Sequence, residues 1–357
     1  MADVINLAAL TANPEEARQV SEAVFEKSFS KPSLNDIHFV QTGVEMDRYI
    51  PIFGNYGLVG KIDPGSCASN VEAGQIPVSE KTWLPKLISF RLEHCQADIP
   101  NLFKMWKKAR IAANTWSEVN NEMMAFVADK VQTAVDESII RIAEFSDTTH
   151  SPVGDGAGNQ LLTAGTTKTY FNMLNGMWSH IFTDGLGAKK IFRYTINENT
   201  LANKTAQDTL PADAALNVLR GLYNGIDPSA FDTNMVFQIS RSLFSNWQDM
   251  LEDKSLVFML NRTEEGATVW SYRGIPIVVR NDWDRIIRTY FNLGNTNYYP
   301  HRAVLSATTN IPIGTSDSES LSMLDSFFDK VTKKHYIDAA YKVDCKILVE
   351  KEIAVAY

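Results

Sequence analysis

The chain has 357 residues, of which 45% are hydrophobic and 21% charged, as is typical of a folded globular protein. This length predicts two or three structural units rather than one. With 34 basic against 42 acidic side chains, the net charge of -8 gives no electrostatic reason to expect tight binding to nucleic acid.

No part of the sequence predicts a membrane anchor or an export signal. Apolar runs stay shorter than the roughly 18 residues that span a bilayer, and the N-terminus lacks a basic segment followed by an apolar one. The three cysteines, Cys67, Cys95 and Cys345, are widely spaced, which favours reduced, inert thiols over a disulfide framework. We therefore expect a soluble protein in a reducing compartment.

The first predicted elements are a helix and a long extended segment. Asn13 can cap a helix from about Pro14 to Phe29, and proline suits its first position. From Ile37 to about Cys95, glycines and prolines alternate with short apolar pieces. We interpret this range as a long hairpin that supports itself poorly, because it is too punctuated for a compact core.

The hairpin is also too apolar for a loop that stays in water. Its large apolar residues include Ile50, Ile52, Phe53, Tyr56, Leu58, Trp83 and Leu87. We expect a neighbouring subunit to cover this surface, with the loop mobile in a free subunit and ordered after assembly. Its last part alternates as a strand, with Leu87, Ser89, Arg91 and Glu93 on one face and Ile88, Phe90, Leu92 and His94 on the other.

The clearest helical pattern runs from about Asn114 to Phe145. Apolar residues recur there at steps of three and four, at Trp116, Val119, Met123, Phe126, Val127, Val131, Val135, Ile139 and Ile142. Charged residues lie mainly off that stripe, at Glu118, Glu122, Asp129, Asp136 and Arg141. A helix of this length would extend about 45 Å. A turn-rich linker, S-D-T-T-H-S-P-V-G-D-G-A-G-N, follows it.

The central part, about 166 to 300, alternates predicted helices and strands. Helices are expected near Thr169–Ile181, Ala212–Tyr223 and Ser240–Leu251, and strands near Ile191–Ile196, Met235–Gln238, Val269–Tyr272 and Ile275–Arg280. Pro276 cannot donate to a ladder, so its strand starts there or lies at an edge. Closing strands are expected at Tyr341–Val349 and Ile353–Tyr357.

None of the candidate reactive groups forms a known catalytic pattern. The run G-D-G-A-G-N at 154–159 resembles a phosphate loop, but a helix precedes it instead of a strand, so we favour a linker. His94 and Cys95 are neighbours in a predicted strand and point to opposite faces. The carboxylate pairs Asp282 with Asp284, and Glu264 with Glu265, lack a pocket-forming motif.

The remaining candidate residues also lack a pattern that would indicate a functional site. Five further histidines lack the short spacing of most zinc sites, and they are His38, His150, His180, His301 and His335. The sequons at Asn203 and Asn261 would matter only in a secreted protein. We therefore expect no catalytic residue, no cofactor site and no metal site.

The order of these elements resembles that of a known family. An N-terminal arm, an extended loop, a long helix ending in E-S-I-I-R-I-A-E-F-S-D, an α/β part containing Y-R-G-I-P-I-V-V, and the closing Y-K-V-D-C-K-I-L-V-E-K-E-I-A-V-A-Y are similar to major capsid proteins of tailed bacteriophages with the Hong Kong 97-like fold. The resemblance covers nearly the whole chain and rests on order and weak local patterns.

The resemblance implies an α+β fold in five parts. They are an N-terminal arm (1–36), an extended loop (37–95), a peripheral domain with a spine helix (96–150), an axial α/β domain (151–300) and return strands of the peripheral domain (301–357). In such a domain N-D-W-D would be the loop after the strand that begins at Gly274-Ile275-Pro276, and Trp283 would be a packing residue.

The implied function is structural rather than enzymatic. Copies of the chain would form hexamers and pentamers of an icosahedral head that encloses double-stranded DNA, in a virion assembled in the bacterial cytoplasm. A separate scaffold, a portal and decoration proteins would be its partners. Some members cross-link through Lys and Asn with Glu assisting; Lys61 and Lys81 lie in the extended loop, but no Asn or Glu matches. An encapsulin-like compartment shell and a soluble α/β metabolic enzyme remain alternatives.

Overall fold

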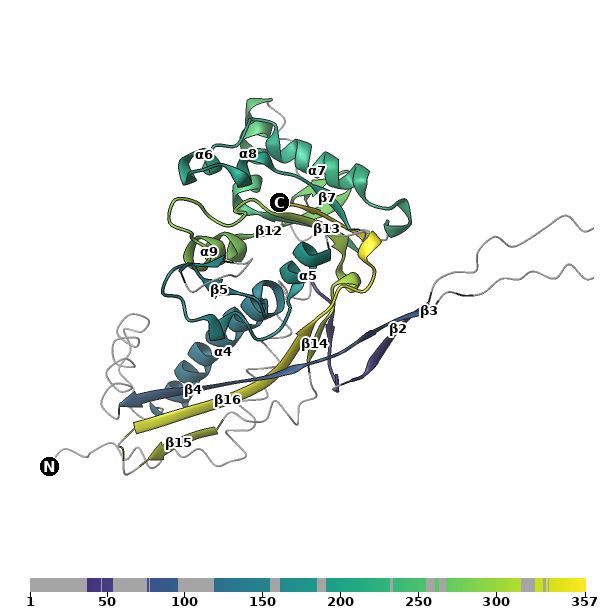
Figure 1. The fold of residues 1–357 in the computed structure, drawn as a ribbon. Helices are drawn as coiled ribbons and strands as arrows, with labels where there is room; N and C mark the ends of the chain where they lie inside the picture. The colour runs from purple at the N-terminus through teal and green to yellow at the C-terminus, as the bar shows by residue number, and fades with distance from the viewer. Residues whose placement is uncertain are drawn as a thin grey trace, which may run out of the picture.

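The computed structural model combines helices and sheets in an elongated molecule (Figure 1), which confirms the expected α+β class. It describes residues 37–45, 47–53, 76, 78–95, 119–154, 161–184, 191–231, 234–254, 261–262, 268–315, 325–329, 332 and 334–357. The predicted helix Pro14–Phe29 and the arm assigned to 1–36 lie outside these residues.

The longest helix is α4, Val119–Phe145, with 27 residues and a length of about 40 Å. It confirms the predicted helix from residue 119 onward, and residues 114–118 lie outside the described part. The predicted apolar stripe is buried at Val131, Val135, Ile139 and Ile142. Asp136 was expected off the stripe but is buried as well.

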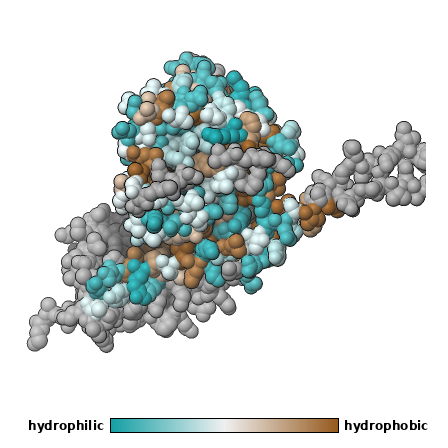
Figure 2. All heavy atoms as spheres, in the orientation of Figure 1, coloured by the Kyte–Doolittle hydropathy of each residue, from teal (hydrophilic) through white to brown (hydrophobic). Residues whose placement is uncertain are grey.

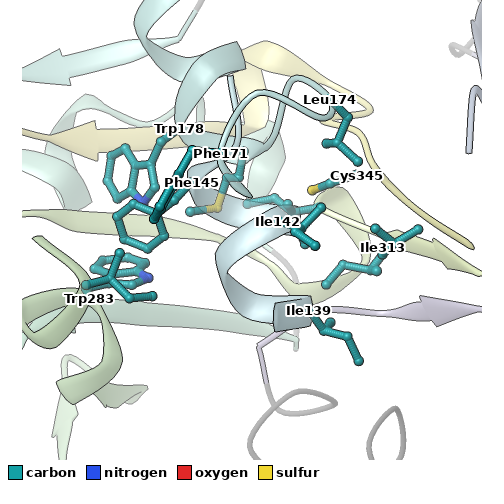
Figure 3. Close-up of a cluster of buried hydrophobic side chains, with 14 of the residues drawn as sticks. Ile139, Ile142, Phe145, Phe171, Leu174, Trp178, Trp283, Ile313 and Cys345 are labelled. Atoms are coloured by element: carbon teal, nitrogen blue, oxygen red, sulfur yellow. The ribbon is translucent and has the colours of Figure 1, made fainter. Parts of the chain in front are cut away.

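The end of α4 forms the centre of the first core. Figure 3 shows Ile139, Ile142 and Phe145 along the helix, with Trp178 and Trp283 beside Phe145 and with Ile313 and Cys345 nearer to the two isoleucines. The rings of Trp178 and Trp283 meet edge to face, with centroids 5.1 Å apart, which is a favourable geometry for aromatic pairs.

A long sheet lies along α4 (Figure 1). Its central strand β16, Lys334–Cys345, pairs antiparallel with β4, Lys86–Cys95, over ten residues. On its other side β16 pairs with β15, Asp325–Asp329, and with β14, Ile313–Thr315. The short strand β1, Val40–Gln41, continues the sheet beside β14.

Strand β4 confirms the predicted alternation but changes the limits of the hairpin. Leu87, Ser89, Arg91 and Glu93 are exposed, whereas Ile88 is buried in the first core. Because its apolar face packs on that core, β4 belongs to the body of the subunit. Within 37–95, the hairpin is therefore formed by β2, Tyr49–Phe53, and β3, Val78–Thr82.

A six-stranded mixed sheet forms the other part of the molecule. Its order is β11 (Ser271–Tyr272), β12 (Ile275–Arg280), β8 (Met235–Ser240), β13 (Ala303–Ala307), β17 (Ile353–Ala356) and β7 (Phe192–Tyr194). Strands β12 and β8 run parallel, as do β17 and β7, while β13 is antiparallel to both of its neighbours. This sheet connects the two halves of the fold.

The two faces of the mixed sheet belong to different cores. Val304, Ile353 and Val355 face the first core, which contains α4. Alternate residues such as Ala303 and Leu305 face a second core beneath α7, Ala214–Gly225, and α8, Arg241–Asp253. Because successive strand residues point to opposite faces, β13 and β17 contribute to both cores at once.

Most elements expected in the central part are present, and α7, α8, β8 and β12 lie close to their predicted positions. Strand β13 was not predicted. All five of its residues are buried, so its short run A-V-L-S-A shows no alternation of apolar and polar residues. The closing strand predicted at Tyr341–Val349 begins earlier, at Lys334, and ends at Cys345.

Pro276 stands at the start of a strand, as expected. Arg273 and Gly274 have φ values of 51° and 83°, which forms a two-residue turn between β11 and β12. Pro276 is the second residue of β12. The prediction of a loop at N-D-W-D was wrong, because Asn281 begins helix α9, Asn281–Tyr290, with Asp282 and Asp284 in its first turn, where acidic residues are favourable.

The helix expected at Thr169–Ile181 is interrupted. A 3-10 turn, η2, covers Lys168–Tyr170, and α5 begins only at Met177 and ends at Asp184. Between them the hydroxyl of Ser146 accepts hydrogen bonds from the backbone N–H groups of Met173 and Leu174, which replaces helical bonding. Gly176 then lets α5 approach α4, because a Cβ there would lie 2.7 Å from the carbonyl oxygen of Ala143.

The remaining elements are short. They are β5 (Ser151–Pro152), β6 (Leu161–Leu162), η3 (Asn197–Thr200), α6 (Lys204–Asp208), η4 (Pro228–Ala230), β9 (Asn261–Arg262), β10 (Thr268–Val269), η5 (Thr308–Asn310) and η6 (Glu350–Glu352). The expected linker thus contains β5, and β5 pairs with β6. Among the described helices, none is long and apolar enough to cross a bilayer.

Candidate functional site

The hairpin of β2 and β3 projects from the body of the subunit (Figure 1). Its strands pair over five residues, from Tyr49 opposite Thr82 to Phe53 opposite Val78. Residues 54–75, which connect the strands, lie outside the described part. From here on, 'the arm' means the hairpin formed by β2 and β3, and not the N-terminal arm expected at 1–36.

One face of the arm carries uncovered apolar side chains. Tyr49, Phe53 and Val78 are 60%, 68% and 61% exposed, and they share a face because Phe53 is the register partner of Val78. Figure 2 shows hydrophobic colour on the projecting arm where it meets the grey atoms. Large apolar residues exposed together on one element mark a surface that another molecule covers.

The root of the arm is fixed to its own subunit by a buried tryptophan. Trp83 follows β3 and is fully buried, with its ring against Gly314, where a Cβ would come within 2.7 Å of it. Its backbone N–H donates to the carbonyl of Arg48 at 2.9 Å, and its carbonyl accepts from Asp47 N–H at 3.0 Å. These bonds hold both ends of the arm together where it leaves the body.

Polar contacts add to this attachment. The backbone N–H of Leu84 donates to Asp344 Oδ2 at 2.8 Å, and Lys81 on β3 forms an ion pair with Glu350 in η6. The direction of the arm is therefore set by the body of its own subunit. The sequence indicates an apolar hairpin, but its pattern does not distinguish Trp83, which is buried against its own subunit, from Phe53, which is exposed.

A buried ionic cluster lies between the two cores. Glu144, near the end of α4, accepts hydrogen bonds from Arg280 Nη2 at 2.7 Å and from Trp283 Nε1 at 2.6 Å. Arg280 also donates to both oxygens of Asp282 and to Gln238 Oε1. Trp283 is fully buried, which confirms its expected role in packing. The cluster joins α4, β8, β12 and α9.

The histidines are not assembled into a metal site in the described structure. His38, His150 and His301 are buried singly in different places. No group of three His, Cys, Asp or Glu residues in the described ranges could hold a metal ion. His94 and His335 are opposite each other in the β4–β16 ladder, and Cys95 is the next residue of β4.

The candidate carboxylates and thiols have structural partners or lie outside the described residues. Asp282 pairs with Arg280, and Asp284 accepts from Arg241 N–H at 2.7 Å. Burial raises the pKa of Asp284 and, more strongly, that of the Cys345 thiol. The side chains of Cys67, Lys61, Glu264 and Glu265 and most of G-D-G-A-G-N fall outside the description.

A cavity of about 190 Å³ lies between η3 and the loop that follows α9. Its walls carry amides, hydroxyls, leucines and tyrosines, including Asn199, Gln207, Asn297 and Tyr298. Burial raises the pKa of Tyr298 to about 12, so this phenol stays neutral. Among the described residues, those that line this cavity are amides, hydroxyls, leucines and tyrosines.

No protein-family model and no curated protein matches the sequence. Among solved structures, a chain of the satellite phage P4 procapsid is similar, with 12% identity, a TM-score of 0.46 and coverage of 95% of this chain and 98% of that one. A chain of the cyanophage A-1(L) capsid has 10% identity, a TM-score of 0.46 and coverage of 91% and 92%.

A virus-like particle from Pyrococcus furiosus is also similar, with 10% identity, a TM-score of 0.41 and coverage of 96% of this chain and 98% of that one. Because these TM-scores are below 0.5, we infer function from the geometry of the chain itself.

Proposed function

We propose that this chain is a major capsid protein, a structural subunit whose copies assemble into a shell. The observation that carries the proposal is the arm, which is fixed at its root and presents Tyr49, Phe53 and Val78 to solvent. A free subunit gains nothing from exposing these side chains. If a neighbouring copy covers them, the contact is stabilised by about 25 cal/mol for each Å² of apolar surface removed from water.

The arm and the surface that receives it are different parts of the chain, so the contact is head-to-tail. Contacts of this kind generate closed rings when the rotation closes. We infer that such rings are the hexamers and pentamers of an icosahedral head. The enclosed content is double-stranded DNA of a tailed phage, and a separate scaffold, a portal and decoration proteins complete the virion.

The interior of the head holds DNA by confinement. The net charge of -8 opposes the counterion-release term that supplies most non-specific affinity for DNA. The isolated chain is therefore expected to show no sequence-selective binding to a short duplex. In this proposal the protein has no catalytic role.

The test is assembly of matched arm variants. The wild-type chain is expressed with and without the candidate scaffold from its own genome, and particles are measured by size-exclusion chromatography and electron microscopy. Phe53→Asp places a charge on the apolar face and should abolish rings and particles. Ser79→Asp adds the same charge to the opposite face of the same hairpin and should assemble.

The outcomes separate the alternatives. Shells that package DNA when portal and scaffold are present support the capsid, whereas shells that enclose a protein cargo support an encapsulin-like compartment. A wild-type chain that stays a small oligomer under every condition contradicts both shells and returns the α/β enzyme to consideration. Equal assembly of Phe53→Asp and Ser79→Asp would show that the apolar face is not an assembly contact.

A further inference from the structure

The cavity between η3 and the loop after α9 contains a polar group that the chain does not use. Asn297 lines this cavity and is only 6% exposed. Its Oδ1 is buried and has no hydrogen-bond partner among the described residues. Buried polar atoms of folded proteins are nearly always hydrogen-bonded, because an unmade bond leaves the loss of water uncompensated. A free amide in the wall of a cavity therefore indicates a bonding group supplied from outside the chain.

The two amides beside Asn297 are, in contrast, fully used. Gln207 Nε2 donates to the carbonyl oxygens of Asn199 and Asn297 at 2.9 and 3.1 Å, and Gln207 Oε1 accepts from the backbone N–H of Asn297 at 2.9 Å. The side chain of Asn199 donates to the carbonyl of His301 at 2.7 Å and accepts from its backbone N–H at 2.9 Å. The amide of Asn297 is thus the exception in a wall whose other amides hold the backbone.

The loop that carries Asn297 is fixed from behind. Arg302, which is fully buried, donates to the carbonyl oxygens of Tyr299 and Tyr298 at 2.8 and 3.0 Å. Tyr299 has a φ value of 45°, a conformation that is unfavourable for a residue with a Cβ and that persists only where the surroundings hold it. The wall of the cavity is therefore preformed, and preorganisation lowers the cost of binding a ligand.

The size of the cavity limits the ligand to one ring. The cavity has a volume of about 190 Å³. A cavity of roughly 150 Å³ admits benzene, whereas sites for drug-sized molecules have about 300 to 1,000 Å³. Leu201 lines the cavity and is 41% exposed, so a ligand can enter from solvent. One six-membered ring fits this space, and a chain of such rings would extend outside it.

The lining indicates a neutral ligand with hydroxyl groups. The described side chains that line the cavity are uncharged, with hydroxyls from residues such as Thr296 and Tyr298 and apolar surface from Leu201 and Leu293. A charged ligand would lose its water without gaining an opposite charge. A purely apolar ring would leave the amide of Asn297 unbonded. A sugar ring has hydroxyls at its edge and C–H groups on its faces, so it matches both kinds of surface.

We propose that this cavity binds one neutral sugar ring, with the amide of Asn297 as its central hydrogen-bonding group. The amide oxygen accepts from a sugar hydroxyl and the amide nitrogen donates to one. Rotation of the amide by a half turn exchanges the two atoms, so either can face the ligand. The described lining residues belong to 199–207 and 293–299, and the inference does not require that the chain form a capsid.

Binding is tested on the full-length wild-type chain by saturation-transfer NMR. The probes are methyl α-D-glucopyranoside and methyl β-D-galactopyranoside, with phenol as a ring of similar size that has a single hydroxyl. At least one glycoside should receive saturation, with a dissociation constant in the millimolar range because a ligand of this size makes few contacts. Phenol should bind several times more weakly. Transfer to neither glycoside would leave water as the occupant and overturn the proposal, and phenol binding as tightly as the glycosides would overturn the assignment to a sugar.

Matched variants place the sugar in this cavity. Asn297→Leu keeps the size of the side chain and removes the amide, so binding should weaken about tenfold, as expected for lost hydrogen bonds. Its urea midpoint should stay equal or rise, because the amide oxygen bonds no described group. Asn199→Leu breaks both bonds to His301 and should lower the midpoint. Leu201→Trp, at an exposed position, should fill the cavity and also abolish binding.

Two results would overturn the site. Unchanged glycoside binding in both Asn297→Leu and Leu201→Trp would mean that the sugar binds elsewhere on the chain. An equal loss of stability in Asn297→Leu and Asn199→Leu would mean that the amide of Asn297 has a structural role and is not free for a ligand.

Discussion

At the scale of single residues, Glu144 is the anion on which the centre of the molecule depends. Its carboxylate accepts hydrogen bonds from Arg280, Trp283 and His38. Glu144 lies in the last turn of α4. Its pKa is lowered to about 2. A carboxyl group whose pKa is lowered by folding stabilises the folded state at pH values above its pKa in the unfolded chain. This stabilisation is lost as the pH falls from that value toward 2.

Replacing Glu144 by Gln should therefore be severe. Arg280 would remain buried with one of its two anionic partners missing, and breaking a buried ion pair in this way costs about 3–5 kcal/mol. Urea unfolding of wild type and variant at neutral pH measures the difference. The control is Glu137→Gln on the same helix, where the half-exposed pair with Arg285 should change stability by no more than about 0.5 kcal/mol.

His301 should make the protein sensitive to mild acid. Burial lowers its pKa, so its neutral form stabilises the fold above the unfolded-state value of about 6.5, and this stability is lost as pH falls below that value. Wild type should lose several degrees of melting temperature between about pH 7 and about pH 5. His301→Gln should be less stable at neutral pH with a shallower acid slope. An unchanged slope would contradict the assignment.

At the scale of elements, sequence periodicity predicted those that have one buried face. Helix α4 buries Val131, Val135 and Ile139 as its stripe requires, and β4 alternates as expected. Strand β13 is buried on both faces, so it has no alternation to detect. The interruption before α5 depends on the hydroxyl of Ser146. Ser146 comes well before α5 in the sequence, so the local pattern around α5 does not reveal this contact.

The candidate site was predictable in outline only. Glycines, prolines and apolar residues in 37–95 indicated an extended element that needs a partner. Tertiary contacts decide which apolar residues of this segment are buried. The ring of Trp83 packs against Gly314 and is buried, whereas Phe53 is exposed. The ionic cluster could not be foreseen, since Glu144 and Arg280 are brought together from elements far apart in the chain.

The crossing of α4 and α5 gives a test at this scale. A Cβ on Gly176 would lie 2.7 Å from the carbonyl oxygen of Ala143 and 3.0 Å from that of Ile142, and backbone atoms cannot rotate away. Gly176→Ala should therefore destabilise the protein by about 1–3 kcal/mol, measured by urea unfolding. Thr183→Ala on the exposed side of α5 should be nearly neutral, and equal effects would show that close packing at Gly176 is unimportant.

At the scale of the whole molecule, the two cores share one sheet. Strands β13 and β17 present alternate residues to each core, and the ionic cluster spans the same boundary. The body is thus joined at its centre, while the contacts described between the arm and the body lie at the root of the arm. Among the described residues, Tyr49, Phe53 and Val78 on the arm are three of the most exposed large apolar side chains, and Leu87 on β4 is exposed to a similar degree.

This arrangement predicts which side chains change environment on assembly. In unassembled protein, hydroxyl radicals should oxidise Tyr49 and Phe53 readily, because they are 60% and 68% exposed, and should spare Trp83, which is buried at the root. In particles, oxidation of Tyr49 and Phe53 should fall severalfold to the level of Trp83, because side chains covered by a neighbouring subunit are shielded from radicals in solvent. Burial of each such side chain stabilises the contact by about 1.5–3 kcal/mol. Mass spectrometry of both samples gives the ratios. Undiminished oxidation of Tyr49 and Phe53 in intact particles would mean that neighbouring subunits meet through another surface and that the arm points into solvent.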